Sequence, residues 1–150
     1  MRTGAVIIAN LEITGLDELN EAFRKISEIP FEVTSKALTS MATVAASKIK
    51  QSGETMRIRD SESNEHILDK IKVSKPKKTD SGGYAEIGFS GTRRRGRQST
   101  SNSYIAFVNE YGKRGQATRP FVSTAIEQNQ NAIASPGEEI ILGWIEKNFK

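Results

Sequence analysis

The chain has 150 residues, of which 36% are hydrophobic and 27% are charged, with a net charge of +4 and no cysteine. This length suits one domain with a modest core, and the lack of cysteine excludes disulfides and thiolate metal sites. The apolar run at residues 5–9 is too short for a signal peptide or a membrane span, so we expect a soluble protein that is cytoplasmic when made.

The N-terminal part of the chain predicts a strand followed by two helices. β-Branched residues and partial alternation over 5–14 favour the strand. The apolar spacing of Leu19, Phe23 and Ile26 predicts a short amphipathic helix.

The second and longer helix is expected over residues 31–50, because Pro30 suits the first turn of a helix. Small residues such as Ala42 and Ala46 would let a sheet or another helix approach it closely. Its apolar stripe, which we predict to be buried, consists of Leu38, Met41, Ala45 and Ile49.

The middle of the chain predicts a polar loop and then a hairpin. Residues 51–63 favour the loop, and 64–68 favour either a single helical turn or the start of a strand. Residues 71–76 and 83–90 are predicted to be antiparallel strands joined by the turn 77–82.

Residues 91–103 contain no apolar side chain. Such a segment cannot bury itself, so we expect a protruding, mobile loop that a partner would order. From residue 92 to residue 119, seven Lys or Arg residues stand against Glu110 alone, a net charge of +6, and the remaining residues together carry −2. This distribution suggests a local acidic partner rather than a protein that coats nucleic acid.

The C-terminal part predicts three helices. Gly112 is placed to end the first, Pro120 to begin the second, and Ser135 with Glu138 to form a capping box for the third. The apolar residues of the first helix fall at helical spacing and are Tyr104, Ile105, Phe107, Val108 and Tyr111. Together, the elements predict one α+β domain, with a long helix packed on an antiparallel sheet, a protruding basic loop and C-terminal helices.

No motif in the sequence predicts catalysis. The only histidine, His66, lies in a polar stretch, which favours a surface side chain. The glycines match neither the P-loop nor the dinucleotide fingerprint. We therefore predict that the protein is not an enzyme, and we predict no cofactor and no metal site.

Arg93, Arg94, Arg95 and Arg97 are the candidate binding residues. Arginines on an exposed loop can pair with phosphates in a salt-sensitive way, so one candidate function is a small basic nucleic-acid-binding protein. No aromatic residue is interleaved in the run, so base stacking is not predicted. The other interpretation is a solvated loop that protects a sheet edge or docks on an acidic protein surface.

Glu110 falls in the last turn of its predicted helix, where a negative charge is unfavourable to the helix dipole. We therefore expect a compensating cation and predict Arg119, because a guanidinium can hold a carboxylate with two hydrogen bonds. Tyr111 and Phe121 would then pack beneath the pair. The competing interpretation leaves Arg119 pointing to solvent or to a neighbouring subunit.

The pattern around these residues is specific. A helix ends in Glu-Tyr-Gly, a short basic turn follows, and Arg-Pro-Phe leads into the next helix. The residues concerned are Tyr104, Glu110, Tyr111, Gly112, Arg119, Pro120, Phe121 and Ala125. In this pattern the chain resembles the tail-component, or tail-completion, family of long-tailed bacteriophages.

The resemblance implies a structural role in the head–tail neck of the virion, where copies assemble as a ring, such as a hexamer, at the connector/tail-tube junction. It implies connector or head-completion proteins and tail-tube or tail-terminator proteins as partners, and no membrane. Within such a ring, the loop arginines would contact channel DNA non-specifically or clamp a neighbouring subunit. The chain would occupy the host cytoplasm during assembly and the virion afterwards.

Overall fold

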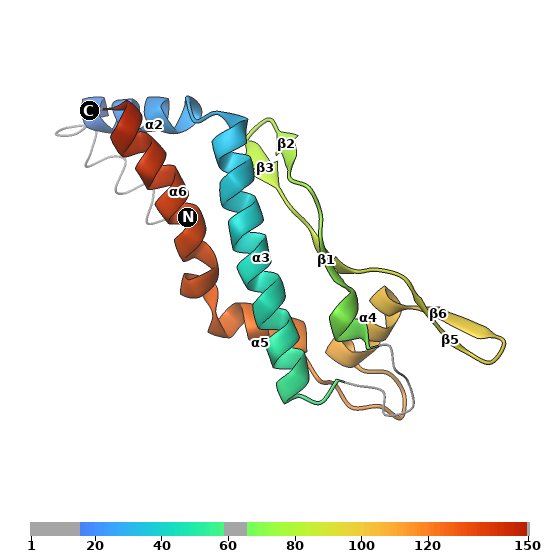
Figure 1. The fold of residues 1–150 in the computed structure, drawn as a ribbon. Coiled ribbons are helices and arrows are strands. Elements are labelled where there is room, and N and C mark those ends of the chain that lie inside the picture. Colours follow the sequence, from blue (N-terminus) through green and yellow to red (C-terminus); the bar gives the residue numbers. More distant parts are fainter. Residues whose placement is uncertain (1–15, 59–65, 150) are drawn as a thin grey trace.

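The computed structural model describes residues 16–58 and 66–149 of the protein (Figure 1). The strand predicted over 5–14 lies outside these residues. Between the described ends, the chain forms α-helices, one 3-10 helix (η1) and short strands. In chain order they are α2 (Leu16–Ser27), α3 (Phe31–Thr55), η1 (Ile67–Lys70), β1 (Ile71–Val73), β2 (Lys77–Thr79), β3 (Gly82–Tyr84), β4 (Ile87–Phe89), β5 (Thr92–Arg95), β6 (Gln98–Ser101), α4 (Asn102–Tyr111), α5 (Phe121–Gln128) and α6 (Gln130–Asn148).

The long helix α3 is the spine of the molecule. It begins after Pro30, whose carbonyl accepts hydrogen bonds from the next turn, and it continues to Thr55, beyond the predicted end at residue 50. Helices α5 and α6 pack against it on one side, and β1 and β3 lie along another (Figure 1). The predicted α+β class, a long helix packed on antiparallel strands with C-terminal helices, is confirmed.

The buried face of α3 is built mainly from small residues. The side chains of Leu38 and Met41, which were predicted to be buried, are only half-buried. A methyl group added at Gly137 of α6 would overlap the Met41 side chain, so Met41 packs directly against the buried Gly137 where α3 and α6 meet. The buried residues of α3 are Ala37, Ala42, Ala45, Ile49 and Gly53.

The predicted central hairpin is present, but its ladder is interrupted. β1 pairs with β4 and β2 pairs with β3, both antiparallel. Between the two ladders, the Ser74 hydroxyl accepts a hydrogen bond from the Glu86 N–H at 2.8 Å. The predicted turn 77–82 is wrong, because Lys77–Thr79 is itself a strand and the reversal is tighter. Strands in the described part of the chain therefore form three two-stranded pairs rather than one sheet.

The last two helices divide at Asn129, not at Ser135. The Asn129 side-chain amide donates a hydrogen bond to the Ala125 carbonyl at 2.8 Å, and Asn129 separates α5 from α6. The predicted capping box at Ser135 is wrong, since α6 already begins at Gln130 and continues through Pro136. A proline inside a helix removes one backbone hydrogen bond and crowds the preceding turn, but α6 continues past Pro136 to Asn148.

The main core lies where the C-terminal end of α3 meets η1, α4 and α5. Phe121, at the start of α5, is fully buried, and its ring contacts that of Phe89 edge-on at 5.8 Å between centroids. The buried residues of this core are Ile49, Ile58, Ile67, Leu68, Ala106, Phe121 and Ala125. The core therefore fixes the segment 103–126 on the body of the protein.

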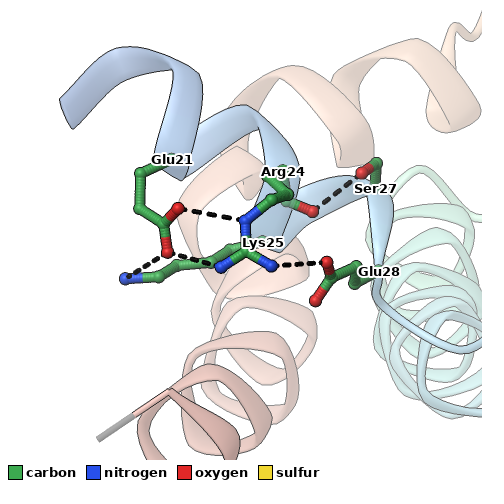
Figure 2. A network of polar contacts seen from close by, with 5 residues as sticks. All are labelled: Glu21, Arg24, Lys25, Ser27 and Glu28. Carbon is green, nitrogen blue, oxygen red and sulfur yellow. Dashed lines mark hydrogen bonds and ion pairs between the residues drawn. The ribbon is translucent and has the colours of Figure 1, made fainter. Parts of the chain in front are cut away.

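Helix α2 lies at the opposite end of the molecule, beside the end of α6 (Figure 1). Figure 2 shows its network of polar contacts, in which Arg24 binds Glu21 at 2.7 Å and Glu28 at 2.8 Å. The hydrogen bond from Arg24 lowers the pKa of the Glu21 carboxyl below its usual value. The guanidinium of Arg24 and the ammonium of Lys25 also lie over the ring of Phe149, which links α2 to the end of α6.

Candidate functional site

Helix α4, a short turn and helix α5 form the segment with the Glu-Tyr-Gly and Arg-Pro-Phe residues. Helix α4 begins after Ser101, whose hydroxyl accepts a hydrogen bond from the Tyr104 N–H at 3.1 Å. It ends at Gly112, as predicted, where φ is 78°, a conformation that glycine adopts without strain. The chain then reverses through a bridge between Lys113 and Gln116.

The carboxylate of Glu110 caps the start of α5. Its Oε2 accepts a hydrogen bond from the Val122 N–H at 2.9 Å, and its Oε1 accepts from the Ser123 N–H at 3.0 Å and from the Ser123 hydroxyl. Pro120, in the N-cap position, offers no side-chain hydrogen bond. Glu110 therefore supplies the acceptor that a capping residue normally provides, and the dipole of α5 favours its charge.

The guanidinium of Arg119 joins three parts of the chain. One terminal nitrogen donates a hydrogen bond to the Arg57 carbonyl at 3.1 Å, just after α3, and the other donates to Asn109 Oδ1 at 2.9 Å. The Arg119 N–H also donates to the Asn109 carbonyl at 2.6 Å. Asn109 is itself held, because its amide nitrogen donates to the Ile105 carbonyl at 2.9 Å. The end of α3, α4 and the start of α5 are thereby fixed to one another.

The predicted ion pair between Glu110 and Arg119 is wrong. Both residues lie in the described part of the chain, and each holds partners other than the other. The helix dipole explains the difference: the start of α5 offers Glu110 two N–H donors and a positive dipole end, so no cation is needed. We call Glu110, Arg119 and the groups they bind the clasp.

The aromatic side chains of α4 point outward. Tyr104, Phe107 and Tyr111, which fall at helical spacing, are 54%, 55% and 67% exposed. The predicted packing of Tyr111 beneath the clasp is therefore wrong, whereas Phe121 is buried as expected. The polar residues Asn109 and Glu110 are buried instead, because their hydrogen bonds to the clasp compensate for lost hydration.

The segment predicted as a loop over 91–103 is a β-hairpin followed by the start of α4. β5 and β6 pair in antiparallel register, with Arg93 opposite Thr100, and Arg95 opposite Gln98. Gly96 adopts φ of 58° at the turn, which a two-residue hairpin turn needs. Alternation along the strand places Arg93 and Arg95 on one face of the hairpin and Arg94 on the other. The prediction of a loop followed from the lack of apolar residues, but antiparallel backbone pairing forms a hairpin here without them.

One face of the hairpin lines a cleft of about 450 Å³. The opposite side of the cleft is formed by α4 and the turn that follows it. Four cationic side chains line it, whereas no Asp or Glu among the described residues does. The cations are Arg93, Arg95, Lys113 and Arg119. Tyr104 also lines the cleft, so the fold brings an aromatic ring to the arginines that the sequence does not place beside them.

The structure divides the predicted site residues into three groups. Arg93 and Arg95 line the cleft, whereas Arg94 and Arg97 are exposed elsewhere on the hairpin. Glu110, Gly112, Arg119, Pro120 and Phe121 serve the architecture of the turn. Tyr104 and Tyr111 contribute to an exposed aromatic surface, in which the rings of Phe107 and Tyr111 lie 4.8 Å apart.

Within residues 16–58 and 66–149, no three His, Cys, Asp or Glu side chains gather where they could hold a metal ion. His66, which was predicted to lie at the surface, is half-buried at the start of η1. None of the helices in the described part of the chain is both long and apolar enough to cross a membrane. Comparison of the chain with protein-family models, with curated proteins and with solved structures finds no match.

Sequence reasoning missed two residues of the clasp. Asn109 is a polar residue in an amphipathic helix and looks like a solvent-facing position, yet it is only 5% exposed. Ser123 lies three residues after Pro120, where its N–H belongs to the first turn of α5 and needs an acceptor. A helix that begins with Pro-Phe and has no capping side chain of its own is a signal that could have pointed to Glu110 as the cap.

Proposed function

We propose that the protein is a non-enzymatic structural component of the head–tail neck of a long-tailed bacteriophage. In this proposal it assembles as a ring at the connector/tail-tube junction. The proposal is carried by the segment 103–126, in which buried and exposed residues have two separate roles. Its buried polar groups hold the chain together, while its large aromatic side chains face solvent.

The hydrogen bonds of the buried polar groups support a structural role. Both oxygens of the Glu110 carboxylate accept hydrogen bonds from the start of α5, and the Arg119 guanidinium is held by two other acceptors. Groups that are already engaged in hydrogen bonds within the chain are poorly suited to move protons or to attack a substrate. The motif is therefore better explained by architecture than by chemistry.

The outward aromatic residues support assembly. Phe107 and Tyr111 border a shallow groove, together with Ile87 and Phe89 of β4 and Val122 of α5. Exposed aromatic clusters with polar neighbours are typical of surfaces that bind other proteins. In the proposed neck, connector or head-completion proteins and tail-tube or tail-terminator proteins are the partners, and other copies of the chain complete the ring.

The proposal is tested in a phage that encodes the chain. Without the gene, we expect filled heads and separate tails that do not join, and we expect the chain in purified wild-type particles by mass spectrometry. A Phe107→Ala/Tyr111→Ala variant should fold but reduce the yield of joined particles, whereas a matched Tyr84→Ala variant on the other hairpin should not. Particles that join normally without the chain would overturn the proposal.

The cleft favours one alternative function, a small basic nucleic-acid-binding protein. Four cations line the cleft and Tyr104 offers a ring for stacking. A salt titration separates the two functions. A nucleic-acid-binding protein should still hold DNA at physiological salt, whereas a neck protein should bind free DNA only weakly and lose it as salt rises.

A further inference from the structure

Exposed charges of opposite sign lie on two separate surfaces of the chain. The first, which we call the basic surface, comprises the β5–β6 hairpin and the turn 113–116, which face each other across the cleft. Its exposed cations are Arg97, Lys113 and Arg114. Arg93 and Arg95 also line the cleft but make contacts of their own, and Arg94 lies on the other face of the hairpin, so Arg97, Lys113 and Arg114 define the surface.

The second surface, which we call the acidic stripe, lies on α6 and comprises Glu138, Glu139, Leu142 and Glu146. At 3.6 residues per turn, these four positions fall within an arc of about 100° around the helix. All four side chains are exposed, Leu142 by 56%. The three carboxylates form no ion pair within the described part of the chain.

The two surfaces cannot meet within one molecule. Figure 1 shows α6 on one side of α3 and the β5–β6 hairpin projecting from the other side, at the opposite end of the molecule from α2. The charges that would neutralise each surface are therefore present in the same sequence but out of reach in the same copy.

We propose that the acidic stripe of one copy docks on the basic surface of the next copy. Because the two surfaces differ, the contact is head-to-tail, and repeated contacts of this type close into a ring when the rotation permits. This inference rests on the proposed ring and names the contact that builds it. Leu142 would add an apolar contact at the centre of the stripe, with Tyr104 beside the cleft as an exposed apolar counterpart.

Charge complementarity favours a second copy over nucleic acid as the occupant. A DNA strand would neutralise the basic surface, but it would leave the acidic stripe without a partner. A second copy accounts for both surfaces at once. Exposed ion pairs are screened by salt, so the contact should be weak and should dissociate as ionic strength rises.

The test uses two charge-reversed variants of the full chain. One carries Arg97→Glu, Lys113→Glu and Arg114→Glu, and the other carries Glu138→Lys, Glu139→Lys and Glu146→Lys. All six side chains are exposed, so both variants should keep the wild-type circular dichroism and thermal midpoint. Sedimentation equilibrium at low and high salt measures self-association. A matched control reverses three lysines outside the basic surface, Lys72→Glu, Lys75→Glu and Lys78→Glu.

Each reversed variant alone should self-associate about a hundredfold more weakly than the wild type, because like charges then face each other. An equimolar mixture of the two should regain association, since each reversed surface now meets its complement in the other variant. The control should associate like the wild type. A wild type that stays monomeric at low salt and high concentration, or a mixture that does not associate, overturns the inference.

Three further outcomes separate the possible failures. If the basic-surface variant loses DNA binding while its self-association is unchanged, the surface serves nucleic acid and the contact is wrong. If particles contain the chain but incorporate both reversed variants normally, the contact fails and the neck proposal stands. If the charge-reversal mixture associates but particles lack the chain, the neck proposal fails and the contact stands.

Discussion

Arginine occurs in both the clasp and the β5–β6 hairpin, but its side chain is held by the fold in the first and exposed to solvent in the second. In the clasp, Arg119 is half-buried and each end of its guanidinium has a fixed acceptor. On the hairpin, Arg94 and Arg97 are exposed at the surface, on a ribbon without a single apolar side chain. The same residue type therefore sets the angle between helices in one region and sets the charge of a surface in the other.

Burial decides whether a charged residue stabilises the fold or shapes the surface potential. A buried polar group destabilises the fold if its partner is removed, because it loses both water and its hydrogen bond. An exposed cation contributes little to stability but determines which surfaces attract or repel. Substitutions in the clasp should therefore change folding, and substitutions on the hairpin should change association.

The largest effect on stability is expected at Phe121, the fully buried residue at the start of α5. Phe121→Ala should lower the free energy of unfolding by about 3–5 kcal/mol, because it leaves a cavity in a fully buried site. Urea denaturation followed by circular dichroism measures the change. The matched Phe107→Ala variant removes an exposed ring from α4 and should change stability by less than about 0.5 kcal/mol. Equal effects of the two substitutions would contradict the assigned core.

The next largest loss of stability is expected on substitution of Glu110, whose carboxylate caps α5. Glu110→Gln keeps the shape of the side chain but removes the charge and one of its acceptor oxygens, so it should cost about 1–3 kcal/mol. Glu127→Gln, an exposed position on the same helix, serves as the control in the same urea titration. A cost at Glu110 no greater than at Glu127 would show that the cap does not stabilise the fold.

A double-mutant cycle tests whether Glu110 and Arg119 contribute to stability independently. Glu110→Gln and Arg119→Gln each remove hydrogen bonds, but to different partners, so their effects on unfolding should add to within about 0.5 kcal/mol. A larger coupling energy would indicate the direct contact between Glu110 and Arg119 that the sequence predicted. The four single and double variants are compared under one set of denaturation conditions.

The hairpin should show the opposite behaviour. Arg94→Ser combined with Arg97→Ser should change the free energy of unfolding by less than about 0.5 kcal/mol, because both side chains are exposed. The same variant should lower the yield of assembled particles or of self-associated protein. Loss of stability comparable to that of Glu110→Gln would remove the contrast between the two regions.

The smallest effect is expected at α2, far from both regions. The hydrogen bond from Arg24 lowers the pKa of Glu21 from its usual 4.5, so any stabilisation is present above that pH and is lost as pH falls through the lowered pKa. The difference in thermal midpoint between the wild type and Glu21→Gln should therefore be small at neutral pH and vanish in acid. A difference that grows on acidification would have the wrong sign.

Sequence periodicity predicts the long elements well and the use of their faces poorly. The helix after Pro30, the helix that ends at Gly112 and the central hairpin all follow from local signals such as proline, glycine and apolar spacing. In α4, however, Tyr111 was expected to pack beneath an ion pair, whereas the structure exposes Tyr111 and buries Asn109 and Glu110. Spacing shows which residues share a face, but not which face finds partners.

The α+β class, the helix end at Gly112 and the concentration of positive charge between residues 92 and 119 can be predicted without a structure, because they depend on local conformation and composition. The tertiary structure was needed to identify the partners of Glu110 and Arg119, because these come from α5, from α4 and from the chain after α3. It also decided that the basic residues face a cleft on one side of α3 while the carboxylates of α6 lie on the other. Contacts between distant segments depend on packing geometry, which no local pattern encodes.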